Sequence, residues 1–352
     1  MYMTAGKVGI AMSGGVDSTV AAVLLQEQGY EVHGFFMELP LKDRAQQIQR
    51  VQATAKSLNI PLQLVDMRRL FSTTIIKKFV AAYTGGYTPN PCVSCNAAIK
   101  FGALLECMLA GGMEKMATGH YARIRQDEKG SYSLLRAVDP GKDQSYFLCR
   151  LDQRQLSHIL FPLATWKKTD VFIRAATLGL EEFSGTESQD VCFLTSGLKQ
   201  FLSEQSIKEQ SGEISAADGR VLGRHSGISH YTVGQRRGLG LPDATPWYVI
   251  GLDPKHNRII VGKNKDLFRR HVLIQNLHWL DTEPVLPWQG LVQLRSRHHP
   301  SPARLQQKDR ATWEIIFTKP QRAITPGQFA VFYEQNRLAG SGIIMTQEPC
   351  RS

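Results

Sequence analysis

The sequence predicts an α/β protein with an N-terminal doubly wound parallel sheet, a small β-rich central domain and a C-terminal β-barrel. In the first half of the chain, short apolar runs alternate with segments whose apolar residues recur at helical spacing, as in a parallel sheet covered by helices. From about Gly212 the helical periodicity disappears, and short strand-like runs with glycine-rich turns replace it. We therefore expect domains at residues 1–207, 208–272 and 273–352.

The individual elements follow from the same patterns. Strands of the first sheet are predicted at 7–12, 31–37, 62–66 and 115–118. Helices are predicted at 19–28, 44–58, 70–83, 99–110, 152–160 and 168–178. A β-hairpin is predicted at 121–137, where a polar turn ends in Gly130. Strands of the second half are predicted at 248–251, 258–261, 292–294, 311–317 and 329–333.

Composition limits the possible partners and compartments. The 352-residue chain has 42 Lys and Arg against 31 Asp and Glu, a formal net charge of +11, which favours a polyanionic partner such as nucleic acid. We expect no membrane segment and no apolar run that approaches the roughly 20 residues needed to span a bilayer. The N-terminus leads directly into the first strand, and the six cysteines do not resemble a secreted disulfide framework. A cytoplasmic protein with reduced thiols is expected.

The segment Ala11–Ser18 lies where the first strand turns into the first helix. Its adjacent glycines permit left-handed backbone angles and close approach to a ligand, and the first amides of the helix favour a bound anion. The spacing is neither a Walker loop nor a dinucleotide fingerprint. It resembles the Ser-Gly-Gly-Xaa-Asp-Ser loop of enzymes that split ATP to form an adenylate; a tight turn without ligand is the alternative. Asp17 and Ser18 are predicted to cap the helix, and Gly29 to end it.

Two cysteines follow a proline-rich stretch, Thr88–Asn96, which we expect to be extended until a helix begins after Asn96. Cys92 and Cys95 are compatible with a redox pair, half of a metal site, or coincidence. Because no second Cys-Xaa-Xaa-Cys exists, a structural zinc site is disfavoured. Proximity to a helix N-terminus predicts a lowered pKa for Cys95. Cys192, taken alone, reads more readily as a packing residue than as a catalytic one.

Six motifs in order make the chain resemble the bacterial tRNA-specific 2-thiouridylases over nearly its whole length. They are Ser13–Ser18, Thr88–Pro91 with Cys95, Ala117–Arg123, Lys142–Leu148, Ser188–Phe193 and Tyr231–Leu239. The resemblance implies a PP-loop, HUP-like adenylation domain, a central domain and a β-barrel that helps to hold tRNA. It also implies the activity of a tRNA-uridine 2-sulfurtransferase, which adenylates the 2-oxygen of the wobble uridine with ATP and replaces that oxygen with sulfur.

The resemblance also implies roles for particular residues. Cys192 matches the cysteine that carries sulfur as a persulfide, and Cys95 matches its partner nucleophile, so a redox-active Cys95–Cys192 disulfide is expected during turnover. The expected ATP-binding residues are Ala11, Met12, Ser13, Gly14, Gly15, Val16, Asp17, Ser18, Met37 and Gly119. The expected tRNA-binding residues are Asn90, Pro91, Cys92, His120, Lys142, Asp143, Gln144, Arg295, Ser296 and Gln328.

Two positions depart from the family pattern. Many members carry aspartate where this chain has Cys92, and tyrosine where it has Ser296. The first change places three thiols in the expected site, so an iron–sulfur cluster held by Cys92, Cys95 and Cys192 is an alternative to the persulfide relay. The second removes an aromatic ring that would stack on a base.

The expected reaction also needs ATP, Mg²⁺, tRNA and a persulfide donor, either a cysteine desulfurase or a sulfur-relay protein. Three rival functions are a tRNA 2-thiocytidine synthetase, a non-catalytic RNA-binding protein with a relic nucleotide fold, and an ATP-dependent amidating ligase. The motifs around Cys192 and Arg236 argue against the first. The intact loop with both Cys95 and Cys192 argues against the second, and the basic C-terminal barrel and paired thiols against the third.

Overall fold

The computed structural model describes residues 6–180, 191–205, 207 and 209–346. The chain forms two compact units. The first unit comprises residues 1–75, 92–193 and 336–338, and the second comprises residues 76–91, 194–335 and 339–352. The three-domain division predicted from the sequence stays a prediction.

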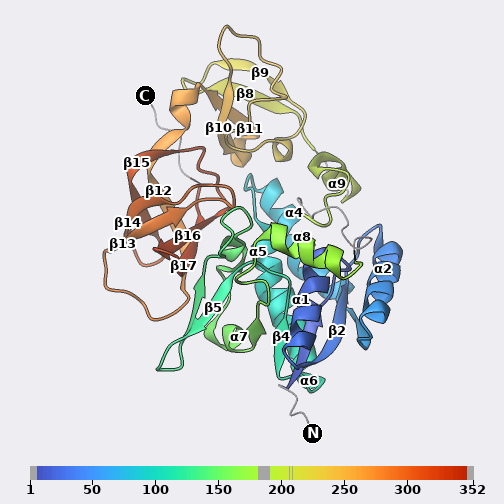
Figure 1. Ribbon diagram of the computed structural model, residues 1–352. Coiled ribbons are helices and arrows are strands. Elements are labelled where there is room, and N and C mark those ends of the chain that lie inside the picture. The colour runs from blue at the N-terminus through green and yellow to red at the C-terminus, as the bar shows by residue number, and fades with distance from the viewer. Residues whose placement is uncertain (1–5, 181–190, 206, 208, 347–352) are drawn as a thin grey trace. The chain divides into compact units, whose positions relative to one another are not determined.

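Within its described residues, the first unit contains a five-stranded parallel sheet with the strand order β3-β2-β1-β4-β7 (Figure 1). The strands are β1 Lys7–Ala11, β2 Glu31–Glu38, β3 Leu62–Asp66, β4 Lys115–Ala117 and β7 Ile159–Leu160. The chain moves outward from β1 to β3 and then crosses to β4 on the other side of β1. The predicted doubly wound parallel sheet is thereby confirmed, with its switch point between β1 and β4.

Alternating side chains of β1 explain why helices cover both faces of this sheet. Val8 and Ile10 are fully buried in a core shared with Val20 and Val51 of helices α1 and α2. Gly9 faces the other way, where an added Cβ would lie 2.8 Å from the Met108 sulfur of helix α6. Because residues alternate across a strand, β1 is buried on both sides, as its near-continuous apolar sequence predicts.

The helices up to residue 180 largely match the predicted segments. They are α1 Val16–Glu27, α2 Arg44–Ser57, α3 Arg68–Phe71, α4 Lys77–Thr84, α5 Pro91–Cys95, α6 Leu105–Ala110, α7 Gln153–Ser157 and α8 Lys168–Thr177, with π-helical segments η1 Ser72–Ile76 and η2 Asn96–Leu104 and the 3-10 turn η3 Ser145–Leu148. The predicted hairpin is confirmed as β5 Arg123–Gln126 paired with β6 Tyr132–Leu135.

Three sequence predictions about these elements were wrong. Helix α5 begins at Pro91, not after Asn96, because proline fits the first turn of a helix, where its missing N–H is not needed. Residues 159–160 form the edge strand β7 instead of the end of a helix. Gly15 is the N-cap of α1, so Asp17 and Ser18 lie inside its first turn, whereas Gly29 follows the helix with a φ of +85° as expected.

The expectation about apolar runs was also wrong. Pro91–Ala110 is a 20-residue helical stretch with a mean hydropathy of 1.4, enough by length and composition to cross a membrane. Ile99, Phe101, Leu104 and Leu105 of this stretch are fully buried in the protein. These four side chains pack inside the protein, and 39% of the stretch as a whole is buried.

The second unit contains a four-stranded sheet with the order β10-β11-β8-β9. Its strands are β8 Gly212–Ala216, β9 Val221–His225, β10 Tyr248–Asp253 and β11 Arg258–Gly262, preceded by helix α9 Leu198–Glu204. The strands β10 and β11 form the predicted antiparallel hairpin, while β11 pairs with β8 in parallel. Ile214, Val249, Ile259 and Val261 fill the small core.

Six further strands of the second unit form a closed barrel in the order β12-β15-β14-β13-β16-β17, and β12 also pairs with β17 (Figure 1). They are β12 Phe268–Trp279, β13 Trp288–Gln293, β14 Ser301–Gln307, β15 Trp313–Arg322, β16 Phe329–Glu334 and β17 Arg337–Ile344. The remaining short 3-10 turns are η5 Ile228–His230, η6 Pro254–His256 and η7 Asn264–Leu267. The predicted C-terminal β-barrel is confirmed, and closure leaves no unpaired sheet edge.

Replacement of Phe332 by alanine tests the barrel core. The Phe332 ring is fully buried, with its centroid 5.6 Å from Trp279 and 5.4 Å from Trp288. We expect Phe332→Ala to lower the free energy of unfolding of the barrel by about 3–5 kcal/mol, measured by urea denaturation followed through tryptophan fluorescence. Phe268→Ala, at a position 44% exposed, should change it by less than about 1 kcal/mol. Equal denaturation midpoints for the two variants would contradict this assignment.

Candidate functional site

The loop between β1 and α1 is held open by a network of its own hydroxyl groups. The Ser18 Oγ donates to the Gly15 carbonyl at 3.0 Å and accepts from the Ser13 N–H at 3.2 Å. Thr19 Oγ1 also donates to the Gly15 carbonyl, at 3.0 Å. The first amides of α1 have no intrahelical acceptor, so they and the positive end of the helix dipole favour an anion at this loop.

Two glycines of the predicted ATP site are required by the backbone around them. Gly14 has a φ of +71°, and a Cβ there would lie 2.9 Å from Arg50 Cγ. Gly119, just after β4, would place a Cβ 2.8 Å from the Asp17 carbonyl carbon and 2.9 Å from the Ser18 nitrogen. The turn after β4 thus packs directly against the start of α1, and only glycine permits that distance.

Asp17 is paired with two side chains from distant parts of the first unit. Lys168 Nζ lies 2.7 Å from Asp17 Oδ1 and 2.8 Å from Oδ2, and the Tyr121 hydroxyl donates to Oδ1 at 2.7 Å. The Lys168 side chain is 8% exposed and that of Asp17 is 34% exposed. Sequence analysis missed both partners, because nothing in the spacing of residues 121 and 168 relates them to the loop.

The remaining predicted ATP residues lie along the same sheet edge. Met12 follows β1, and its N–H donates to the Phe35 carbonyl of β2 at 2.8 Å. Met37 is half-buried near the carboxyl end of β2, opposite Val65 of β3. In a parallel sheet this edge is the expected place for a ligand. Contact of Met37 with an adenine ring stays a prediction.

The three cysteines of the predicted site belong to the first unit, which also contains Cys107 and Cys149. Cys92 and Cys95 are half-buried on α5, one turn apart, and Cys192 is exposed. Phe193 anchors the Cys192 segment, since its ring packs edge-on against Phe71 at 5.8 Å. Residues 188–190, which complete the motif around Cys192, lie outside the described residues. Burial is the largest influence that raises the pKa of Cys192, and Cys95 and Cys92 raise it further.

The lowered pKa predicted for Cys95 was wrong. Burial, the largest influence, raises the pKa of Cys95 to about 11, and Cys92 contributes in the same direction. Burial likewise raises the pKa of Cys92 and, although the residue as a whole is exposed, that of Cys192. Loss of water around a thiolate outweighs the first turn of the short helix α5. At neutral pH these thiols are therefore protonated.

Within the described residues, Lys100 is the one cation that lowers the pKa of Cys92, of Cys95 and of Cys192. It lies on η2, where the π-helical turn changes which residues share a face. Gln155 stabilises this turn, because its Nε2 donates to the Ala97 and Phe101 carbonyls, each at 2.9 Å. Gly102 accommodates it, since a Cβ there would lie 2.9 Å from the Ala97 oxygen.

His120 lies between aromatic rings and is held in one orientation. Its ring centroid is 5.5 Å from that of Phe101 and 5.9 Å from that of Phe161, and its Nδ1 is 2.7 Å from Thr118 Oγ1. Burial, with a smaller contribution from Lys100, holds the pKa of His120 well below its usual value. The imidazole is therefore neutral at physiological pH, so it offers hydrogen bonding without charge.

The segment Lys142–Gln144 has internal partners besides any role with RNA. The Asp143 side chain, 9% exposed, accepts from Arg136 at 3.1 Å and from the Ser145 hydroxyl at 2.9 Å. Gln144 accepts from the Tyr121 N–H through Oε1 and donates its own N–H to the Tyr121 carbonyl, both at 2.9 Å. The Lys142 N–H donates to the Asp139 carbonyl. Contact of these residues with tRNA stays a prediction.

In the second unit, two predicted RNA-binding positions are linked through Thr88. Gln328 Nε2 donates to the Thr88 carbonyl at 2.8 Å, and the Thr88 N–H donates to the Pro326 carbonyl at 2.8 Å. These two hydrogen bonds hold the backbone at Thr88, two residues before Asn90. Asn90 in turn precedes Pro91. Gln328 therefore orders the segment that carries Asn90 in this unit.

Arg295 and Ser296 lie in the connection between β13 and β14. The Gln293 side chain donates to both of their carbonyls, at 3.1 and 2.9 Å, and so shapes this connection. Ser296 is exposed and Arg295 half-buried. Their contact with tRNA stays a prediction.

The described residues do not fit a resident metal cluster. No three His, Cys, Asp or Glu side chains in that part of the chain are grouped so that they could hold a metal ion. The thiols of Cys92, Cys95 and Cys192 influence one another without forming such a group, so the iron–sulfur alternative is not favoured.

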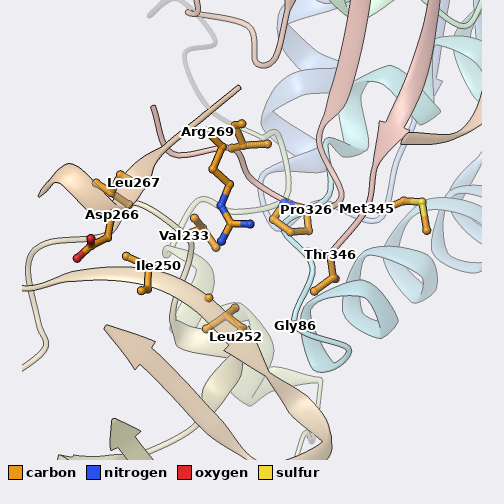
Figure 2. Close-up of a pocket in the computed structure, with 12 residues that line it drawn as sticks. Gly86, Val233, Ile250, Leu252, Asp266, Leu267, Arg269, Pro326, Met345 and Thr346 are labelled. Atoms are coloured by element: carbon orange, nitrogen blue, oxygen red, sulfur yellow. The ribbon is translucent and has the colours of Figure 1, made fainter. Parts of the chain in front are cut away.

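A small cavity of about 30 Å³ lies in the second unit (Figure 2). Figure 2 shows the Arg269 side chain extending toward the middle of this cavity, between Val233 and Pro326. The space holds one or two water molecules and is far too small for a nucleotide or a base. Its other lining residues include Gly86, Ile250, Leu252, Asp266, Met345 and Thr346.

Comparison with known proteins finds matches along the whole chain. Three family models match consecutive parts: a tRNA methyl transferase HUP domain at residues 6–196, a tRNA methyl transferase PRC-barrel domain at 199–263, and an aminomethyltransferase beta-barrel domain at 269–344. The tRNA-specific 2-thiouridylase MnmA of Desulfotalea psychrophila is 45% identical over 342 residues, covering 96% of this chain and 98% of that protein. MnmA of Syntrophomonas wolfei is 41% identical over 342 residues, covering 96% and 99%.

Gly14→Ala tests the left-handed turn of the loop. With a φ of +71° and Arg50 Cγ 2.9 Å from the new methyl group, we expect a loss of about 1–2 kcal/mol in the free energy of unfolding, measured by urea denaturation without nucleotide. Gly15→Ala is the matched control, because Gly15 has a φ of −96° and only Ser13 Oγ, at 3.4 Å, near the added Cβ. If Gly15→Ala lowered the free energy of unfolding more than Gly14→Ala does, the assignment of the strained turn to Gly14 would be contradicted.

The pH dependence of Cys95 alkylation tests the raised thiol pKa. Since only thiolate reacts, the rate of modification by iodoacetamide should rise about tenfold per pH unit from pH 7 to pH 10, below the pKa of about 11. Lys100→Met should slow the reaction at each pH in this range, because it removes the charge that lowers the pKa, and Lys167→Met should not. Peptide mass spectrometry assigns the modified cysteine. A rate that levels off near pH 7 would disprove the raised pKa.

Proposed function

The chain belongs to the tRNA-specific 2-thiouridylase family, and we propose that it is an ATP-dependent sulfurtransferase that converts the wobble uridine of tRNA to 2-thiouridine. The observation that carries this proposal is the match at 45% identity over 342 residues, which spans 98% of the relative. The similarity therefore includes the loop, the thiols and the barrel together. The basic composition, with a net charge of +11, suits a polyanionic substrate such as tRNA.

The loop Ala11–Ser18 and Gly119 would bind the phosphates of ATP. The φ of +71° at Gly14 and the close approach of Gly119 to α1 support this assignment, because backbone without side chains can come close to a bound anion. ATP supplies activation: transfer of AMP to the uridine 2-oxygen converts a poor leaving group into a good one. Mg²⁺ would bind mainly through the phosphates, as it commonly does, and needs few protein ligands.

Cys192 would receive sulfur as a persulfide, and its solvent exposure suits delivery by a donor protein. Cys95, as thiolate, would attack the Cys192 sulfur; the bond between the two persulfide sulfurs breaks, and a Cys95–Cys192 disulfide forms. The terminal sulfur keeps the electron pair and becomes bonded to C2 of the uracil, while AMP departs with the original oxygen. An external thiol then supplies two electrons to reduce the disulfide.

Because the pKa values of the thiols are raised, the scheme needs a deprotonation step, and Lys100 favours that step. Cys95 must lose a proton before it attacks, and burial opposes that loss. Lys100 offsets part of the cost by lowering the pKa of the thiols. His120, being neutral, would serve as a hydrogen-bonding contact to RNA and not as a cation.

The chemistry favours sulfur transfer over the methyl transfer in the descriptions of the family models. A nucleotide-binding strand–loop–helix and a cluster of thiols within one compact unit are what activation and thiolation require. The proposed tRNA-binding set comprises Asn90, Pro91, Cys92, His120, Lys142, Asp143, Gln144, Arg295, Ser296 and Gln328. A persulfide-bearing donor protein and a cytoplasmic location complete the proposal.

Nucleoside mass spectrometry of tRNA tests the function. In cells lacking this protein, wild-type complementation should restore 2-thiouridine derivatives, whereas Cys95→Ser and Cys192→Ser should restore less than about 1% of them, because serine cannot carry or exchange sulfur.

Cys107→Ser is the matched control, since this half-buried cysteine lies on α6 away from the proposed chemistry, and it should restore the modification fully. Restoration by either Cys95→Ser or Cys192→Ser would refute the role of that thiol.

A further inference from the structure

Lys168 is a buried cation at the first position of α8. Its backbone N–H donates to Asp139 Oδ2 at 3.0 Å, which fixes the start of the helix. Its ammonium lies 4.7 Å from the centre of the Phe172 ring and 5.9 Å from that of Tyr121. Hydrogen bonding and cation–π contacts thus hold the Lys168 side chain against the loop.

The carboxylate of Asp17 would repel a phosphate bound at the loop, and the ammonium of Lys168 offsets its negative charge. Asp17 lies in the first turn of α1, where the helix dipole and unpaired amides attract anions. A carboxylate there competes with a polyphosphate for the same positive potential and repels it. Lys168 contacts both carboxylate oxygens, at 2.7 and 2.8 Å, and Tyr121 donates a further hydrogen bond to one of them.

We propose that Lys168 is a positioning residue for the nucleotide: by pairing with Asp17 it neutralises that carboxylate, so that the loop amides remain available to the polyphosphate of ATP. This inference rests on the proposed function, because it takes ATP as the ligand of the loop. Lys168 acts on the nucleotide through Asp17, and the positive charge of Lys168 is what this role requires.

The alternative hypothesis, that the Lys168–Asp17 ion pair only stabilises the fold, predicts a different result. If Lys168 only stabilised the fold, removal of its charge would lower stability without selectively weakening ATP binding. If it neutralises Asp17, removal of both charges together should restore binding, because no uncompensated carboxylate remains. Asn is nearly isosteric with Asp and retains an acceptor for the Tyr121 hydroxyl.

Isothermal titration calorimetry with ATP in the presence of EDTA measures the effect on the full-length protein without a contribution from magnesium. We expect Lys168→Met to weaken binding by at least about tenfold, as an uncompensated carboxylate close to phosphate should. Lys168→Met added to Asp17→Asn should change binding by less than about threefold relative to Asp17→Asn alone, because no carboxylate remains to be neutralised, and the conservative Lys168→Arg should bind within about threefold of wild type. Lys167→Met, at the exposed neighbouring position, is the matched control and should bind as wild type does.

Wild-type affinity in a folded Lys168→Met variant would overturn the inference, and so would a double variant in which Lys168→Met weakens the Asp17→Asn protein as much as it weakens the wild type. If Lys168→Met does not fold, the comparison of the double variant with Asp17→Asn and that of Lys168→Arg with wild type still decide the matter: a change of less than about threefold in both supports the inference, and a larger loss in either refutes it. A wild-type protein that binds no ATP, with magnesium or without, would instead refute the proposed function and this inference with it.

Discussion

Parallel pairing of β1 with both β2 and β4 is the constraint on which the candidate site depends. It brings the carboxyl ends of three neighbouring strands to one edge, so that the loop before α1 and the turn at Gly119 meet there. Gly119 lies so close to the start of α1 that a methyl group would stand 2.8 Å from the Asp17 backbone. The shape of the proposed nucleotide site therefore follows from sheet register and from the absence of one side chain.

The same edge is connected to the segment proposed to contact tRNA. Gln144 makes two hydrogen bonds with the backbone of Tyr121, and the Tyr121 hydroxyl donates to Asp17, which Lys168 pairs. If RNA displaced residues 142–144, Tyr121 would transmit the movement to Asp17 in the loop. This chain of contacts gives a physical route by which substrate could influence the nucleotide site, and the internal partners of Asp143 and Gln144 explain why both residue types occur there.

Sequence reasoning worked where the signal is local and periodic. It predicted β3 at its observed bounds, the doubly wound sheet, and the hairpin of β10 and β11. It placed the start of α5 too late because proline, read as a helix breaker, was in fact at a helix start. It could not predict Lys168 beside Asp17, which depends on tertiary contact across 151 positions of sequence. It also gave the pKa of Cys95 the wrong sign, because helix position is visible in sequence and desolvation is not.

The central claim of the proposed function is that Cys95 attacks the Cys192 persulfide, which releases the terminal sulfur to the uridine and leaves a Cys95–Cys192 disulfide. A single turnover with persulfidated enzyme, ATP and unmodified tRNA in the absence of reductant, followed by acid quench and non-reducing peptide mass spectrometry, tests it directly. The account predicts a peptide pair crosslinked through Cys95 and Cys192, formed in proportion to 2-thiouridine and removed by a thiol reductant. Formation of 2-thiouridine with both cysteines recovered unlinked would contradict it.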